Sequence, residues 1–150
     1  MRRLLLIVTV LAFPLSAMAG PKEDAQAVFD KFLTEFTAAN LEGVVGVFWP
    51  DAHFWGTTMT KLATTPGEVR QYFSDFSRFK PNERKATALG QISATAVSDS
   101  VVLLSGTWQV DRIVDGQQRL TPLRISLAVT KRGDRWAIAQ FHNSPRPNPQ

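Results

Sequence analysis

The second half of the chain alternates between apolar and polar residues with a period of two. We predict a β-strand in each of four segments: residues 86–96, 100–110, 120–130 and 135–143. The pairs Asp115-Gly116 and Gly133-Asp134 lie between the later segments and are typical of tight hairpin turns. Four consecutive strands with short connections favour an antiparallel meander, and the rest of the chain must pack around it.

The last of these segments has two distinct sides. Period-two counting places Trp136, Ile138, Gln140 and His142 on one face, and Ala137, Ala139, Phe141 and Asn143 on the other. We expect this strand in the middle of the sheet, with a pocket on one side and a subunit contact on the other. His142 faces either the pocket or the subunit contact, and its position opposite Phe141 and Asn143 favours the contact.

The residues before Pro81 follow helical spacing. Apolar residues three or four apart predict a helix over residues 21–40 and a short second helix over residues 41–48. Thr65 and Glu68 form a capping box around Pro66, so a third helix begins there and continues to Phe79. Between the second and third helices we expect a turn at residues 49–52 and a strand at residues 53–57. Helices packed in a curved antiparallel sheet make an α+β domain in the shape of a cone.

The N-terminus has the pattern of an export signal. Arg2 and Arg3 precede an apolar run from Leu4 to Phe13, and Ala17-Met18-Ala19 is a small-residue cleavage site. The run is too short to span a bilayer, so we expect cleavage after Ala19 and no stable membrane anchor afterwards. The chain then consists of a signal peptide (1–19), one domain (20–147) and a frayed tail (148–150), in the periplasm or secreted.

Composition argues against several classes of partner. Removing Arg2 and Arg3 from the 17 basic residues leaves 15, against 13 acidic ones, and they are scattered, so we expect no nucleic-acid binding. There is no cysteine and there are only two histidines, without metal-ligand spacing, so we expect neither a metal nor a cofactor. The run Val101-Val102-Leu103-Leu104 is apolar on both faces, which predicts that a second copy covers part of the outer face.

The order of elements resembles the NTF2-like (SnoaL-like, ketosteroid-isomerase-like) superfamily over roughly residues 22–147. The ending Trp136-Ala-Ile-Ala-Gln-Phe-His-Asn-Ser-Pro, with Pro50-Asp51-Ala52 and Phe54-Trp55-Gly56-Thr57, is similar to the association domain of calcium/calmodulin-dependent kinase II and its bacterial stand-alone relatives. This resemblance implies a cone with an internal pocket that forms dimers or larger rings. It does not imply kinase activity, because the kinase motifs are missing.

The resemblance also gives expectations about the pocket. The association domain lines its pocket with arginines, and the matching positions here are about Gly106, Leu127 and Asn143, none of them basic. This departure from the family's pattern argues against an acidic ligand. Our predicted ligand contacts are Asn143, Phe141, Trp55, Tyr72, Phe76 and Leu127, although all but Asn143 also fit a plain core.

Two functions remain open from the sequence. The first is an exported homodimeric module that binds a small, largely apolar molecule or serves assembly, without turnover. The alternative is a small isomerase- or cyclase-type enzyme that acts on a carbonyl compound, with Asp51, His53 or Tyr72 as acid or base. No compact acid–base constellation is visible in the sequence, which favours the first reading, but the superfold hosts both.

Overall fold

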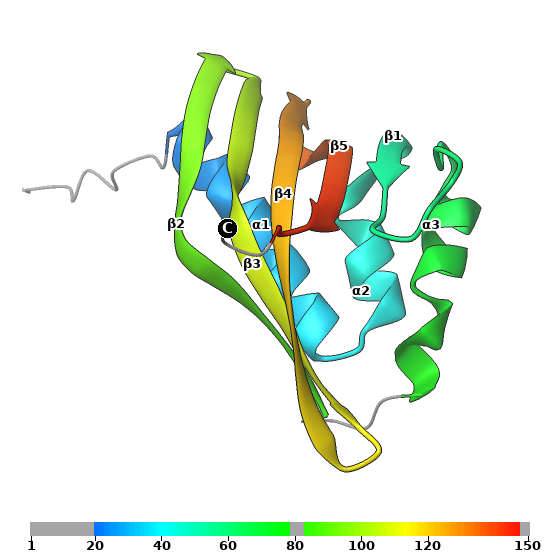
Figure 1. Cartoon of the computed structure of the whole chain (residues 1–150). Coiled ribbons are helices and arrows are strands. Elements are labelled where there is room, and N and C mark those ends of the chain that lie inside the picture. The colour runs from blue at the N-terminus through cyan, green and yellow to red at the C-terminus, as the bar shows by residue number, and fades with distance from the viewer. Residues whose placement is uncertain (1–19, 79–82, 148–150) are drawn as a thin grey trace, which may run out of the picture.

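A computed structural model describes residues 20–78 and 83–147 of the chain, without the side chain of Ser77 (Figure 1). The predicted signal peptide and the tail after residue 147 lie outside the described residues. In chain order the elements are α1 (Pro21–Thr37), α2 (Leu41–Gly46), β1 (Phe48–Trp55), α3 (Pro66–Tyr72), the 3₁₀-helix η1 (Ser74–Arg78), β2 (Arg84–Ser98), β3 (Val101–Val114), β4 (Gln117–Arg132) and β5 (Arg135–Pro145). No helix within these described stretches has the length and apolar character needed to cross a membrane.

The five strands form one curved sheet in the order β1-β5-β4-β3-β2. The four strands of the predicted meander are antiparallel, and the β3–β4 turn places Asp115 and Gly116 at positive φ (52° and 74°), as a tight hairpin requires. The expectation of a purely antiparallel sheet is wrong, because β1 pairs with β5 in parallel. The sheet is therefore mixed, within the predicted α+β class.

Residues 49–52 are not the turn that Pro50 and Asp51 suggest. They belong to β1, whose register with β5 is interrupted between Phe48 and His53. Pro50 fits there because β1 is an edge strand, where a residue without an N–H group costs no ladder hydrogen bond on the open side. The predicted strand at residues 53–57 is thus the second half of a longer one.

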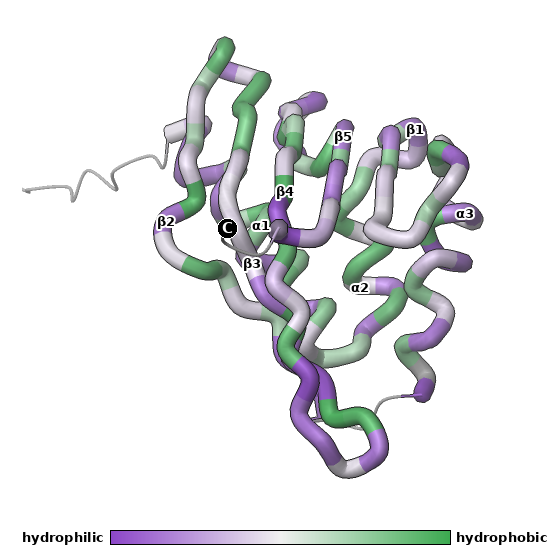
Figure 2. Tube along the Cα trace, viewed as in Figure 1, coloured by the Kyte–Doolittle hydropathy of each residue, from purple (hydrophilic) through white to green (hydrophobic). Residues whose placement is uncertain are grey.

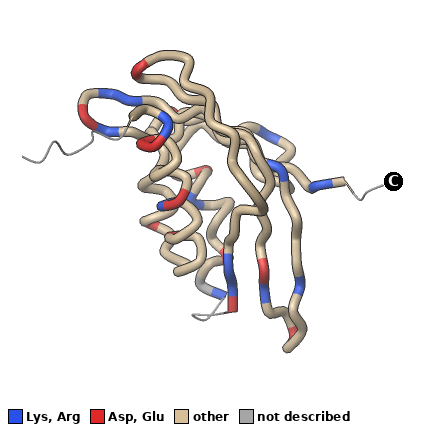
Figure 3. The backbone as a smooth tube through the Cα atoms, turned by 90° about the vertical axis from the view of Figure 1, so that its left-hand side faces the viewer, with Lys and Arg blue, Asp and Glu red and all other residues tan. Residues whose placement is uncertain are grey.

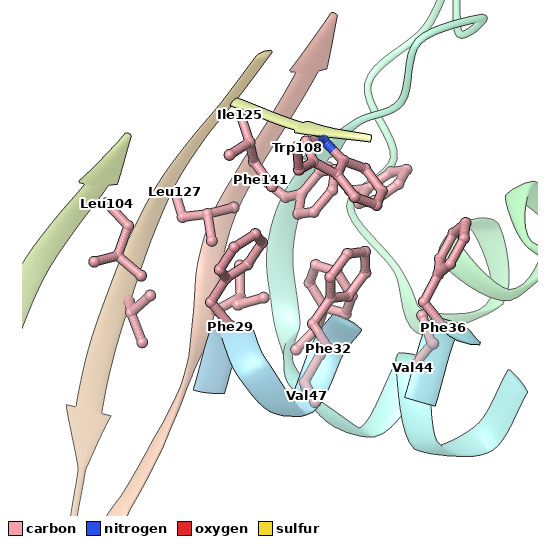
Figure 4. Packing of buried hydrophobic residues seen from close by; sticks show 14 of the residues in the cluster. Phe29, Phe32, Phe36, Val44, Val47, Leu104, Trp108, Ile125, Leu127 and Phe141 are labelled. Atoms are coloured by element: carbon pink, nitrogen blue, oxygen red, sulfur yellow. The ribbon is translucent and has the colours of Figure 1, made fainter. Parts of the chain in front are cut away.

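Helix α1 packs on the concave face of the sheet and supplies the centre of the core. Its apolar face consists of Ala25, Phe29, Phe32 and Phe36, all buried. Figure 4 shows Phe32 among side chains from the sheet, and its ring centroid lies 5.3 Å from that of Phe141 and 5.7 Å from that of Trp108. Such tilted and edge-on ring pairs contribute about 0.5–1.5 kcal/mol each beyond their burial.

The predicted starts of the second and third helices are confirmed. Asn40 accepts a hydrogen bond from the Gly43 N–H at the start of α2, and the Thr65–Glu68 capping box begins α3. Helix α3 ends earlier than expected, at Tyr72, and its apolar stripe continues through η1. Phe73 and Phe76 remain buried in that tighter turn, so the packing predicted for a longer helix is kept.

Strand β5 contains a β-bulge that changes its two faces. Ala128 of β4 pairs with Gln140, whereas its neighbour Val129 pairs with Ile138, so Ala139 is an extra residue. The bulge shifts the alternation by one position, and both Ile138 and Phe141 are buried in the core. The predicted face that groups Ile138 with His142 is therefore wrong, while His142 does lie opposite Phe141 and is exposed.

The convex face of the sheet carries two cross-strand rows of exposed or half-buried side chains. Register places them in the order Thr95, Leu103, Ala128, Gln140, His53 and, beside it, Ser93, Ser105, Ser126, His142, Trp55. Most of these side chains are small or polar, and Leu103 (47% exposed) and Trp55 (36%) are the large apolar ones. Of the four-residue apolar run, Val102 and Leu104 face the core, so only part of it contributes to this convex face.

Candidate functional site

A cavity of about 420 Å³ lies between the concave side of β3, β4 and β5 and the segment formed by α3 and η1. This volume is within the range of roughly 300–1,000 Å³ that is usual for small-molecule sites. The described residues that line it are Phe32, Phe36, Thr57, Thr58, Tyr72, Phe73, Asp75, Phe76, Arg84, Trp108, Val110, Arg112, Thr121, Leu123, Phe141, Asn143 and Pro145.

Seven of the seventeen described residues that line the cavity are aromatic. Phe36 lies 5.2 Å from Phe76 and 5.5 Å from Trp108 between ring centroids, and Phe73 is packed against both phenylalanines. Figure 4 shows Phe32, Phe36, Trp108 and Phe141 converging from α1 and the sheet. Interlocking rings of this kind form a rigid wall that suits a flat or ring-shaped guest.

Asn143 is buried in the wall with its orientation fixed. The indole Nε1–H of Trp108 donates to Oδ1 of Asn143 at 2.9 Å. Because an indole N–H can only donate, the carbonyl oxygen of the Asn143 amide must face Trp108. Its Nδ2 makes no hydrogen bond within the described part of the chain, which leaves a fixed donor on the cavity wall.

Arg84 is a buried cation at one end of the cavity, with 3% of its surface exposed. Its Nε and Nη2 donate to the carbonyl oxygen of Phe36 at 3.0 and 2.7 Å, in the last turn of α1, where positive charge suits the helix dipole. The guanidinium also stacks over the rings of Phe36 and Phe76, 4.1 and 3.5 Å from their centroids.

The charge of Arg84 is held at an energetic cost. Burial lowers its pKa to about 10; the carboxylate of Asp75 raises it, and the nearby charge of Arg112 lowers it further. A pKa of this size still leaves the group protonated at neutral pH. The cavity wall therefore contains a protonated, largely desolvated guanidinium.

Tyr72 connects the cavity wall to the loop after β1. Its hydroxyl oxygen accepts the Thr57 N–H at 3.1 Å and lies 2.9 Å from Oγ1 of Thr57. The ring packs so closely on Gly56 that a Cβ there would lie 2.3 Å from Cζ of the ring. Gly56 is therefore the residue that lets Tyr72 reach the loop and close this side of the cavity.

The structure brings together four of the six residues predicted as ligand contacts. Tyr72, Phe76, Phe141 and Asn143 line the cavity. Trp55 does not, because the parity of β1 turns it to the convex face beside His142. Leu127 does not either; it pairs with Leu104 and is buried in the core (Figure 4).

Two of the candidate acid–base residues lie away from the cavity. Asp51 and His53 are exposed on β1, and Asp51 accepts a hydrogen bond from Arg132 at 2.8 Å. This bond holds the pKa of Asp51 below its ordinary value, which suits an ion pair and makes a poor base. Only Tyr72 of the three candidates is at the cavity.

Sequence reasoning missed Arg84, Arg112 and Asp75. Arg84 and Lys85 look like the end of a hairpin, and buried arginines are rare enough that a core position is not expected. Period-two counting along β3 contained the signal, however. It places Arg112 in phase with Val110 and Trp108, which face inward.

A metal site does not emerge from the geometry of residues 20–78 and 83–147. Within these ranges no three histidine or acidic side chains come close enough to hold an ion. The polar groups of the cavity are arginine, amide and hydroxyl groups with one carboxylate, and this set provides mainly hydrogen-bond donors.

Comparison with known proteins gives a consistent family assignment. The family model for the SnoaL-like domain matches residues 25–148. The fold is similar to that of a Xanthomonas campestris protein assigned to the calcium/calmodulin-dependent protein kinase II association domains, with a TM-score of 0.74, 18% identity and coverage of 96% of this chain and 99% of that one.

Two further solved structures show the breadth of the fold. The association domain of the C. elegans kinase matches with a TM-score of 0.69 and 16% identity, over 82% of this chain and 94% of that one. A ketosteroid isomerase-like protein from Erwinia carotovora atroseptica matches with a TM-score of 0.69 and 13% identity, over 85% and 97%. No curated protein matches the chain. At these identities the likeness concerns the fold alone.

Proposed function

The chain belongs to the SnoaL-like domain family, part of the NTF2-like superfamily, and from that premise we propose that it is an exported, self-associating module that binds one small molecule. The observation that carries the proposal is the aromatic cavity of about 420 Å³ with a few oriented polar groups. A mostly apolar cavity with a small number of fixed donors is what ligand sites in proteins have in common.

Binding without turnover is supported by the roles of the polar groups. Oδ1 of Asn143 is engaged by Trp108, and the hydroxyl of Tyr72 is engaged by Thr57. Arg84 donates to the end of α1. These groups are held by the protein frame, as recognition requires.

Self-association is supported by the convex face and by the relatives. The two rows described above are short side chains around Leu103 and Trp55, which suits packing of one sheet against another. Two of the similar structures are association domains by description. In this arrangement His142 lies in the contact between two copies, away from the ligand.

Export is supported by the residue pattern of the first 19 positions. We expect the exported protein to begin at Gly20. Intact mass spectrometry of protein recovered from the periplasm or medium measures this directly, and exported material that still carries Met1 would contradict it.

A second candidate function rests on one further observation. The hydroxyl of Tyr72 and the carboxylate of Asp75 line the same cavity, so an acid and a base are available there for an isomerase or cyclase acting on a carbonyl compound. One of the similar structures is described as ketosteroid isomerase-like. Asp75 takes the place of Asp51 and His53 in this reading.

The deciding experiment uses protein purified from its own host. Native mass spectrometry of the mature protein should show a bound small molecule, which is released on denaturation. That compound is then incubated with the protein in heavy water. Recovery without deuterium supports a binding module, whereas deuterium next to a carbonyl that disappears in Asp75→Asn supports the enzyme. Protein that carries no small molecule would contradict both readings.

A further inference from the structure

The second half of β2 is an open edge of the sheet. β2 is the last strand in the sheet order and pairs only with β3, and Figure 1 shows it as the outermost strand. We call residues 93–98 the edge segment. Its register with β3 is regular from Ser93 to Ala96, and its residues are exposed except Ala94, which is half-buried.

Two backbone hydrogen bonds fix the direction of the groups along β3. The N–H of Ile113 donates to the carbonyl of Glu83, beside the start of β2, at 2.9 Å. Backbone groups alternate sides along a strand, so the odd-numbered residues of β3 bond to β2 and the even-numbered ones to β4. The N–H of Lys131 donates to the carbonyl of the even-numbered Ser100 at 2.8 Å, in agreement with this alternation.

This alternation leaves two residues of the edge segment with outward backbone groups. Thr95 pairs with the odd-numbered Leu103, so its N–H and C=O bond to β3. Ala94 and Ala96 therefore direct their N–H and C=O groups away from the sheet. Within residues 20–78 and 83–147, no group bonds to them on that side. The edge segment thus presents donors and acceptors at the spacing that another strand needs.

The opposite edge of the sheet is protected in ways that are usual for edge strands. β1 contains Pro50 and Asp51, and Asp51 forms an ion pair with Arg132. On the side of β1 away from β5, Ala63 exchanges backbone hydrogen bonds of 2.9 and 3.1 Å with Phe54. Prolines, charges and covering loops keep other chains from pairing with an edge.

β2 has such protection only at its start. Arg84 and Lys85 lie there, and Thr37 accepts the outward N–H of Ala86 at 2.9 Å. Residues 86–98 contain no charged residue and no proline. Figure 3, which faces this side of the molecule, shows no charge on β2 between its basic start and the turn to β3. Residues 92–97 read Ile-Ser-Ala-Thr-Ala-Val, a composition typical of strands that pair with copies of themselves.

We propose that the edge segment pairs with the edge segment of a second copy, antiparallel and about a two-fold axis at Thr95. Ala94 then exchanges hydrogen bonds with Ala96 of the second copy, and Thr95 lies opposite its counterpart. Threonine pairs are among the favourable cross-strand pairs. The inference rests on the proposed self-association and adds a contact through the sheet edge, separate from the contact through the convex face.

The edge itself favours a second copy over a peptide from another protein. In the regular stretch, a two-fold axis at Thr95 is the placement that pairs the outward groups of Ala94 and Ala96 with each other. The joined sheets would then end in β1 on both sides, where the edge is blocked, so this pairing stops at two copies. A contact through one short segment is small, so we expect it to act together with the convex face and to be weak alone.

The test traps the pairing with a disulfide, because the chain has no cysteine of its own. Opposed residues in a non-hydrogen-bonded antiparallel pair have Cα atoms about 4.5 Å apart, and disulfides span roughly 4.4–6.8 Å. Mature Thr95→Cys, oxidised by copper phenanthroline at tens of micromolar, should form a covalent dimer on a gel without reductant.

Thr87→Cys is the matched control. Thr87 is exposed on the same strand and the same face, but it lies before Gly90 and far from the proposed axis, so its counterpart would be tens of ångströms away. We expect this variant to cross-link at least about tenfold less than Thr95→Cys. Equal cross-linking of the two variants would overturn the inference, because random collisions would then explain it.

A proline substitution tests the backbone bonds themselves. Ala96→Pro removes an N–H that points away from β3, so the ladder within each copy is retained, as prolines on edge strands allow. Added to Thr95→Cys, it should abolish the cross-link while circular dichroism stays unchanged. An undiminished cross-link would contradict strand pairing. If the double variant does not fold, the contrast between Thr95→Cys and Thr87→Cys still decides.

The outcomes separate the edge contact from the proposed function. If the wild type sediments as a dimer and Thr95→Cys cross-links no better than Thr87→Cys, the inference fails and association through the convex face stands. If Thr95→Cys cross-links selectively while the wild type sediments as a monomer, the edge contact stands and the convex-face contact fails.

Discussion

Asn143 combines a structural role with a binding role through the two ends of one amide. Replacing it by leucine removes the partner of a buried indole N–H, and an unsatisfied buried donor costs about 1–3 kcal/mol. We therefore expect Asn143→Leu to fold but to lose about this much stability, measured by chemical denaturation. Asn143→Asp keeps an oxygen acceptor for Trp108 and replaces the Nδ2 donor by a second carboxylate oxygen.

The aspartate variant is the matched control for the leucine one. It should retain more of the stability than the leucine variant, because the indole N–H of Trp108 keeps an acceptor. A leucine variant as stable as the wild type would mean that the bond from Trp108 contributes nothing net. The residue would then serve the ligand alone.

The residues of the cavity could be predicted from the sequence only in part. Phe141 and Asn143 follow from parity on the final strand, since both lie beyond the bulge and the count between them is undisturbed. Arg84 could not be predicted, because its burial depends on the carbonyl of Phe36 and on two rings distant in sequence. Those partners meet only when α1 crosses the sheet.

The loop after β1 depends on a close contact with α3, and Gly56 makes this testable. A Cβ at residue 56 would lie 2.3 Å from the ring of Tyr72, so Gly56→Ala must displace the ring or the loop. Overpacking of this kind costs about 1–3 kcal/mol. We expect a lower melting temperature and weaker ligand binding, because Tyr72 also closes the cavity.

Gly46 provides the control for that substitution. It ends α2, and a Cβ there meets nothing within 4 Å. Gly46→Ala should be neutral or stabilise by up to about 1 kcal/mol, since alanine favours helices over glycine. Equal melting temperatures for the two variants would show that the contact between Gly56 and Tyr72 is unimportant.

The start of α3 gives the helix a dependence on pH. The backbone N–H of Thr64, the hydroxyl of Thr65 and the N–H of Thr65 donate to Glu68 and hold its pKa below the ordinary value. A depressed carboxyl pKa stabilises the folded state at neutral pH, and this contribution is lost as pH falls through the folded-state value.

We therefore expect wild type and Glu68→Gln to differ most at neutral pH. Glutamine accepts hydrogen bonds but does not titrate, so the gap in melting temperature should close as pH falls from about 7 to about 3. The lowered pKa values of Glu42 and Asp51 affect both proteins equally and cancel. A gap that stays constant with pH would show that the capping box works without the charge.

Strand β5 shows why element faces are harder to predict than elements. Its existence follows from local alternation, but its bulge depends on how it registers with β4. Because Ala139 is an extra residue, Ile138 faces the core instead of the predicted convex side. Phe141 and Asn143, after the bulge, lie on the face that the alternation predicts. A period-two count has no means of detecting such a shift.

At the scale of the whole molecule, local signals in the sequence predict the order of helices and strands. They do not predict that β1 runs parallel to β5. Capping residues and hairpin turns act within a few positions and are visible in the sequence. β1 joins β5 across more than eighty residues, with an irregular register and a proline. The β3–β4 hairpin, which is largely hydrophilic but exposes Ile113 and Leu120, follows from its turn and its alternation (Figures 1 and 2).

The convex face decides whether the molecule acts alone or as a pair. Leu103 lies on β3, next to the edge strand β2, and is 47% exposed in the single chain. If a second copy covers it, Leu103→Lys buries a charge without a partner and should shift the protein from dimer to monomer at tens of micromolar, measured by sedimentation.

Leu120→Lys, on the β3–β4 hairpin where leucine is 54% exposed, makes the same chemical change away from the face and should leave the dimer intact. Because the cavity lies on the opposite side of the sheet, both variants should retain the small molecule that co-purifies with the wild type. A wild-type protein that sediments as a monomer would remove the second copy from the proposal, and a loss of ligand in Leu103→Lys would mean that the two faces of the sheet are coupled.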